Sequence, residues 1–226
     1  MATSSSIDLD LTARQVVEFA LHKINLLATG QAVEANIAAR ALTELEVMLK
    51  EWMKHPSIWL EKEGYVLPLA NTASYSLTPR PYRVTDCRFR TSSGTDIAMY
   101  ELTRQEYYDL PNKGATGTPT QWFFDPQRAT SSLFIWPVLS SVTTQTIRVT
   151  YQRRIEDIDD LGNEIDVPQE HLSLVGFNLA ARLADNFGKN GTHVDRIIAR
   201  AGMLLESAMD ADRPQMIRFC ADHRNG

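Results

Sequence analysis

The sequence has few of the residues that build catalytic or metal sites. Its 226 residues contain two cysteines, Cys87 and Cys220, which lie far apart in no metal-ligand spacing. We expect both to be free thiols in a reducing compartment. No two of the five histidines stand four residues apart, which excludes the helical histidine pair of a zinc protease. The sequence also lacks the Gly-x-Ser-x-Gly turn of a serine hydrolase and a complete phosphate-binding loop. We therefore expect no enzymatic activity, no cofactor and no metal ion.

Positive charge and long apolar runs are also scarce. Lysine and arginine total 23 against 28 acidic residues, a formal net charge of −5. A general nucleic-acid binder normally carries a basic excess, so this composition argues against one, although it does not exclude DNA passing nearby. No apolar run approaches the length of a membrane span, and we expect no membrane partner. Residues 1–10 are rich in serine and have no apolar region, so we expect a flexible arm there and no signal peptide.

Helical periodicity marks both ends of the chain. Apolar residues make up 43% and charged residues 23%, an ordinary composition for a protein with a packed core. Thr12 and Gln15 form a capping box that predicts the start of the first helix, and Gly30 predicts its stop. Apolar residues at helical spacing predict three further helices, at about residues 32–54, 168–188 and 192–213.

The middle of the chain has a different pattern. From residue 57 to about 155 it is rich in Thr, Tyr, Val, Trp and Pro, in short runs between turn residues. Ile147, Val149 and Tyr151 alternate with polar residues, which is typical of a strand with one buried face. The runs predict strands at Gly64–Leu67, Ala73–Leu77, Arg83–Arg90, Ile97–Leu102, Thr120–Phe124, Leu133–Trp136 and Thr146–Tyr151, with a mobile loop at Pro111–Thr118.

These patterns predict an α+β fold: a four-helix bundle with a large β-sandwich or barrel-like insert between the second and third helices. The expected parts are an arm at 1–10, a helical bundle domain formed by 11–56 and 167–212, a β domain at 57–155, an acidic linker at 156–166 and a tail at 213–226. The acidic run resembles a calcium loop, but Leu161 and Pro168 occupy two positions that need oxygen ligands. A solvated linker is the simpler interpretation.

Candidate interaction residues lie on the helices and in one strand region. The second and last helices have apolar faces wide enough for a core and a second contact. We assign Leu42, Leu49, Ile198 and Leu205 to contacts between subunits. The arginine cluster that includes Arg83 and Arg88 has three possible roles: pairing with a neighbour's acids, contact with DNA phosphates, or a solvated face. We favour the neighbour's acids. The aromatic residues of the β segment are interpreted as core.

Several pieces of the chain, in order, resemble a family. They are Ala73-Ser-Tyr-Ser-Leu77, Pro81-Tyr-Arg-Val84, Tyr107-Tyr-Asp-Leu-Pro111, Gly117-Thr-Pro119, Gln121-Trp-Phe-Phe124, Leu133-Phe-Ile-Trp-Pro137, Ile147-Arg-Val-Thr-Tyr-Gln-Arg-Arg154, Val167-Pro168 and Leu179-Ala-Ala-Arg-Leu-Ala184. This order, which covers about residues 12–210, resembles podophage head-to-tail adaptors, also called tail tubular or gatekeeper proteins.

The resemblance implies a structural virion protein. Such a protein forms a homo-oligomeric ring, expected to be a dodecamer, under the portal protein, where it extends the DNA channel. It docks tail nozzle or tail fibre proteins at the head-tail junction of a virion assembled in the host cytoplasm. We expect the tail to dock on the portal through Arg213, Met216, Ile217, Arg218, Phe219 and Arg224. Two alternatives stay open: a neck or head-completion protein of a longer-tailed phage, and a carbohydrate-binding β-sandwich module.

Overall fold

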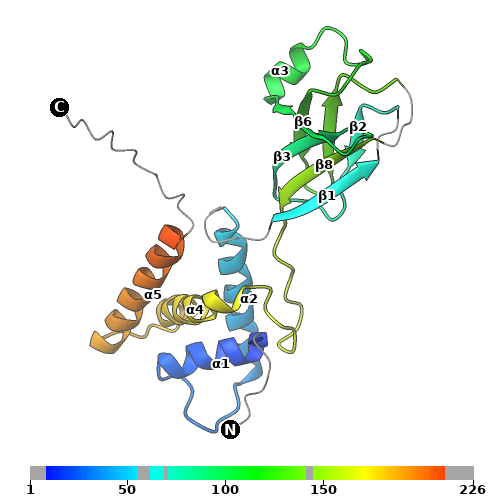
Figure 1. The fold of residues 1–226 in the computed structure, drawn as a ribbon. Coiled ribbons are helices and arrows are strands. Elements are labelled where there is room, and N and C mark those ends of the chain that lie inside the picture. The colour runs from blue at the N-terminus through cyan, green and yellow to red at the C-terminus, as the bar shows by residue number, and fades with distance from the viewer. Residues whose placement is uncertain (1–8, 55–61, 69–70, 141–144, 212–226) are drawn as a thin grey trace, which may run out of the picture. The chain divides into compact units, whose positions relative to one another are not determined.

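The computed structural model describes residues 9–54, 62–68, 71–140 and 145–211. The chain divides into two compact units (Figure 1). The helical unit comprises residues 1–58 and 155–226, and the β unit comprises residues 59–154. Both helices and sheets are present, which confirms the α+β prediction. None of the described helices is long and apolar enough to cross a membrane.

The helical unit is organised around α4 (Leu172–Asn186). The other long helices are α1 (Ala13–Lys23), α2 (Ala35–Trp52) and α5 (Thr192–Ala211), and the short 3-10 turn η1 (Gln169–His171) precedes α4. All three long helices pack against α4, which Figure 1 shows nearly end-on among them. The four expected helices are therefore present, but they cross around a central helix and do not run alongside one another as in an aligned bundle.

Local sequence explains where the first helix begins. Thr12 accepts a hydrogen bond from the Gln15 amide, and the Gln15 side chain accepts one from the Thr12 amide at 2.9 Å. This reciprocal cap is the one that the sequence predicts. The buried face of α1 consists of Ala13, Val16, Val17, Ala20 and Leu21.

The segment after the β unit differs from the solvated linker that the sequence predicts. Ile155, Ile158 and Ile165 are buried in the helical unit, and the segment between them lies along the start of α1. The Ala13 amide donates to the Asn163 carbonyl at 2.8 Å, and the Arg14 amide to the Leu161 carbonyl at 2.9 Å. First-turn amides of a helix have no partner within the helix, so this packed segment satisfies two of them.

The β unit is a sandwich of two four-stranded sheets. One sheet has the order β1 (Lys62–Pro68), β8 (Thr146–Gln152), β3 (Arg83–Arg90) and β4 (Asp96–Ala98). The other has the order β2 (Ser74–Ser76), β7 (Ser131–Trp136), β6 (Gln121–Pro126) and β5 (Tyr100–Glu101). Residues from both sheets form one core, which includes Cys87, Phe89, Trp122, Leu133 and Ile147. This arrangement is the sandwich form of the predicted insert.

Two parts of the β unit differ from the sequence prediction. The strand expected at Ile97–Leu102 is two strands, because the chain passes from one sheet to the other at the buried Met99. The short helix α3 (Arg104–Asp109) then follows, and its Thr103–Glu106 capping box is a signal that the sequence analysis missed. The expected mobile loop at Pro111–Thr118 is held by backbone bonds, which include one from the Gly117 amide to the Val138 carbonyl at 2.9 Å.

Candidate interaction surfaces

The outer face of the sheet that contains β3 and β8 carries a cluster of arginines. We call this the arginine face; it consists of Arg83, Arg88 and Arg90 on β3 and Arg148 on β8. Arg88 lies directly opposite Arg148 in the antiparallel pairing. Like charges in this position destabilise a sheet unless nearby groups compensate them.

A β-bulge in β3 turns Arg88 and Arg90 outward. The pairing of β3 with β8 shifts register between Val84 and Asp86. Side chains of a strand alternate between faces, so one extra residue reverses the alternation beyond it. Cys87 and Phe89 therefore enter the core, while Arg88 is exposed. Burial strongly raises the pKa of the Cys87 thiol, and the carboxylates of Asp86 and Glu101 add to this effect.

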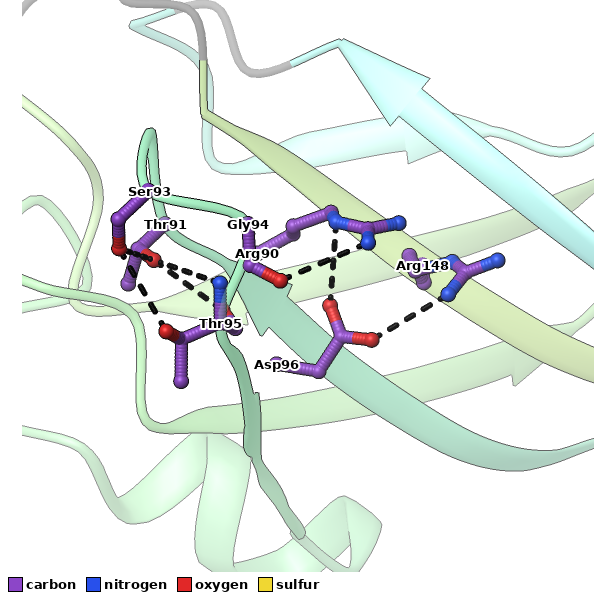
Figure 2. Close-up of polar contacts among 7 residues, drawn as sticks. All are labelled: Arg90, Thr91, Ser93, Gly94, Thr95, Asp96 and Arg148. Carbon is purple, nitrogen blue, oxygen red and sulfur yellow. Dashed lines mark hydrogen bonds and ion pairs between the residues drawn. The ribbon is translucent and has the colours of Figure 1, made fainter.

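Two aspartates form ion pairs with three arginines of this face, Arg88, Arg90 and Arg148. Arg88 Nε lies 2.6 Å from Asp86 Oδ2. Asp96 lies between two arginines (Figure 2): its Oδ2 is 3.2 Å from Arg148 Nη1, and its Oδ1 is 3.5 Å from Arg90 Nε. The Asp86 carboxylate, which bonds to the Arg88 guanidinium, raises the arginine's pKa. Four arginines and two aspartates give this face a net positive charge on a chain whose net charge is −5.

The hairpin that leads to Asp96 is tied by its own hydroxyl groups (Figure 2). The Thr95 amide donates to Thr91 Oγ1 at 3.1 Å, and the Ser93 hydroxyl lies 2.8 Å from the same oxygen. Gly94 has a φ of 88°, a conformation that favours glycine, and its amide donates to the Thr91 carbonyl at 2.9 Å. These bonds fix the turn that places Asp96 beside the arginines.

A shallow hollow of about 300 Å³ lies on the arginine face. Its floor includes Gly64 of β1, which pairs with Thr150 of β8. A Cβ atom at Gly64 would have no heavy atom within 4 Å, so the absence of a side chain leaves this space open. The hollow is lined by Gly64, Asp86, Arg88, Asp96, Arg148 and Thr150.

A second surface is an apolar stripe on α5. Ile198 is 50% exposed, and Leu205 and Met209 are partly exposed at helical spacing from it. The core side of the same helix is formed by Val194, Ile197, Ala201 and Ala208. The stripe lies beside that core side, which agrees with an apolar face wide enough for a second contact. On α2, Leu42 is partly exposed, and Val47 is 45% exposed.

Leu49 requires a correction. Its side chain is 1% exposed, inside the core of the helical unit with Leu45 and Met48. A side chain buried in this way cannot also contact a neighbouring subunit, so we withdraw the intersubunit role assigned to Leu49. Arg83 and Arg88 are both exposed, as such a role requires. The tail residues Arg213, Met216, Ile217, Arg218, Phe219 and Arg224 lie outside the described residues.

The aromatic residues of the β unit pack mainly against one another. The Tyr107 ring stacks on Phe123 with 5.1 Å between centroids and lies 4.9 Å from Phe134. Trp122, Phe123 and Tyr107 are buried, whereas Tyr108 is 57% exposed. The core interpretation is therefore confirmed for Trp122, Phe123 and Tyr107, and it is wrong for Tyr108. Within the described part of the chain, no three His, Cys, Asp or Glu side chains gather into a metal-binding group.

An apolar groove of about 280 Å³ lies beside α1 and α4 in the helical unit. Phe19 of α1 forms part of its wall and meets Phe177 edge-on, with 5.6 Å between centroids. The Lys23 ammonium lies 4.9 Å from the Phe19 ring centroid, within the range of a cation–π interaction. The groove is lined by Leu9, Leu11, Val16, Phe19, Gln169, Leu172, Ser173 and Gly176.

No protein-family model and no curated protein matches this chain. Among solved structures, it is similar to a chain from the neck of an empty gene transfer agent particle, computed with C6 symmetry. The TM-score is 0.32 with 13% identity, over 80% of this chain and 87% of that chain. A chain from the virion of a native gene transfer agent particle has a TM-score of 0.29 and 16% identity, over 82% of this chain and 87% of that one. Scores this low do not establish a shared fold.

Proposed function

We propose that this chain is a structural protein of a phage particle and has no enzymatic activity. In this proposal it is a head-to-tail adaptor that forms a homo-oligomeric ring, expected to be dodecameric, under the portal. The ring extends the DNA channel without binding DNA specifically, and it offers a surface to tail nozzle or tail fibre proteins. Its place is the head-tail junction of the virion, after assembly in the host cytoplasm.

The main support is that the order of the adaptor-like sequence motifs agrees with the order of the helical and β segments in the structure. The adaptor resemblance implies a helical part interrupted by a β insert, and the chain has two units arranged in this order. The insert begins with β1 and ends with β8, which pair with each other from Lys62 opposite Gln152. The start of β1 therefore lies beside the end of β8, so the helical unit can form from two distant segments.

The exposed apolar stripe on α5 supports assembly with other copies. Ile198 is exposed on a helix whose adjacent side already serves the core. An apolar stripe on a folded unit is commonly an interaction surface. A ring needs two different surfaces of the chain that complement each other, and the α5 stripe is a candidate for one of them.

A neck or head-completion protein of a longer-tailed phage remains the second candidate in this class, because it uses the same kind of ring. The carbohydrate-binding module receives less support. A binding platform needs exposed aromatic faces, and the Tyr107 and Phe123 rings are stacked on each other and buried, although Tyr100 and Tyr108 of the same unit are exposed.

The test is to measure the mass of the purified chain in solution and to view it by negative-stain microscopy with purified portal rings. We expect a closed ring that stacks coaxially on the portal. A chain that stays monomeric at high concentration, both alone and with portal rings, would contradict the proposal. A variant that lacks residues 214–226 tests the assigned portal contacts. We expect it to keep its circular dichroism spectrum and to lose portal attachment.

A further inference from the structure

We propose that the arginine face of one copy receives the acidic segment 156–166 of a second copy. This inference rests on the proposed ring and names one of its contacts. The segment carries six acidic residues and no lysine or arginine: Glu156, Asp157, Asp159, Asp160, Glu164 and Asp166.

The arginines keep donors for a further anion. A guanidinium has five N–H donors in a planar fork that matches a carboxylate. Among the described residues, Arg88 uses Nε to bind Asp86, and Arg148 uses Nη1 to bind Asp96. The two side chains are 52% and 47% exposed and lie opposite each other in the sheet. A carboxylate between them would relieve the repulsion of this pair as well as accept their hydrogen bonds.

The hollow has the size and the charge pattern for carboxylate side chains and a poor pattern for DNA. Asp86 and Asp96 line it together with Arg88 and Arg148. A duplex carries one negative charge for about every 1.7 Å of its axis and would bring phosphates close to both aspartates. A protein segment with separate carboxylates can meet the arginines and avoid the aspartates. The chain's net charge of −5 further opposes a DNA contact.

The acidic segment is held in place before any docking. Its isoleucines are buried, and the Ile165 amide donates to the Leu11 carbonyl at 3.1 Å. Part of its charge is already used, because Asp157 pairs with Lys50 and Asp160 accepts a hydrogen bond from the Gly162 amide at 2.7 Å. A preorganised segment loses little conformational entropy on binding.

The acids that remain available are Glu156, Asp159 and Glu164. All three are exposed, and their side chains form no ion pair with any residue in the described ranges. The arginine face and the acidic segment are different patches of one chain, so their pairing is heterologous. Heterologous contacts form a ring when the rotation from copy to copy closes, as the proposed ring requires.

Charge-reversal substitutions test the pairing of the arginine face with the acidic segment. Assembly is followed by mass photometry over a range of protein concentrations. We expect R88E/R148E and E156K/D159K each to raise the concentration needed for assembly by about tenfold or more. The variant that combines all four substitutions, and an equal mixture of the two double variants, should both return close to the wild-type value. As controls, R128E in the β unit and D185K on α4 change exposed charges away from these patches and should have little effect.

Gly64→Val adds a steric test, because it fills the hollow without changing charge and meets open space in the folded unit. We expect it to weaken assembly without lowering thermal stability, because valine suits a strand better than glycine. Circular dichroism of every variant verifies that it is folded.

The outcomes separate this inference from the proposed function. A wild-type ring that persists in both reversed variants would overturn the pairing and leave the ring intact. Loss in both variants without rescue in the combined one would also overturn it. If salt disrupts the contact between the arginine face and the acidic segment, but the contact does not depend on protein concentration, the segment on the arginine face belongs to the same chain. That result would also overturn the pairing between copies. Duplex DNA binding that R88E/R148E abolishes would identify a nucleic-acid surface in its place. A wild-type chain that forms no ring contradicts the proposed function itself.

Discussion

At the scale of single residues, Gly176 determines how closely α1 approaches α4. A Cβ atom placed on it would lie 2.7 Å from two ring atoms of Phe19. That ring is also fixed by Phe177 and Lys23. Glycine in a helix is normally destabilising by about 1 kcal/mol relative to alanine, so its presence here reflects packing.

We expect Gly176→Ala to lower the free energy of unfolding by about 1–3 kcal/mol, the usual cost of overpacking. Urea unfolding followed by circular dichroism measures it. Gly202→Ala on α5 is the matched control, because its added Cβ meets nothing within 4 Å. It should raise stability by up to about 1 kcal/mol through helix propensity. Equal effects of the two substitutions would show that the contact with Phe19 has no energetic role.

His171, at the end of η1, makes stability depend on pH. Burial lowers the pKa of its imidazole, and the Glu170 carboxylate acts in the opposite direction by raising it. The unfolded chain then binds the proton more tightly than the folded chain. The stabilising contribution is complete above the ordinary histidine pKa of 6.5 and is lost as the pH falls through the lower folded value.

We therefore expect the urea midpoint to fall between about pH 7.5 and 5.5, and to fall less in His171→Gln. An NMR titration of the imidazole should give a pKa below its ordinary range in the folded protein. An ordinary or raised pKa, or the same pH dependence in both proteins, would contradict this assignment.

At the scale of elements, α5 serves two surfaces at once. Three consecutive residues differ sharply in exposure: Ile197 is 4% exposed, Ile198 is 50% exposed, and Ala199 is also exposed. Successive helical residues are about 100° apart, so these three sample the core, the apolar stripe and the polar side. Replacing each of the three with glutamate therefore distinguishes an effect on folding from an effect on assembly.

We expect Ile197→Glu to destabilise the helical unit by about 3 kcal/mol or more, since it buries a charge in place of a core side chain. Ile198→Glu should change unfolding by less than about 0.5 kcal/mol but weaken ring assembly. Ala199→Glu should affect neither. Thermal unfolding and mass photometry of the three variants give both readouts. Normal assembly of Ile198→Glu would show that the apolar stripe on α5 is not part of the interface between copies.

At the scale of the whole molecule, each unit has its own core. The core of the β unit draws on both sheets and includes Val84, Phe89, Trp122, Ile135 and Val149. The ends of this unit lie side by side through the pairing of β1 with β8. Units with a separate core and adjacent ends commonly fold without the rest of the chain.

We expect residues 59–154, expressed alone, to fold and to unfold cooperatively with a single transition. Dispersed amide signals in an NMR spectrum and a sharp thermal transition would support this. Ile147→Asp in the same fragment should abolish both, because Ile147 is fully buried. A disordered wild-type fragment would show that the β unit depends on the helices.

The sequence by itself determined the type and order of most elements. Capping residues, helical periodicity and alternation act over a few neighbouring residues, so the Thr12 cap, the four long helices and the strand at Arg83–Arg90 could be read directly. The sandwich core was also predictable from its apolar and aromatic residues.

Only the tertiary structure decided which side of each element is covered. The bulge before Asp86 turns Arg88 to the surface, and the change of sheet at Met99 divides one expected strand. Buried isoleucines hold in place an acidic segment that the sequence predicts to be a solvated linker. Leu49 and Leu42 likewise belong to one helix, yet Leu49 is buried and Leu42 is partly exposed. In each case the deciding contact comes from residues distant in sequence, which local patterns do not report.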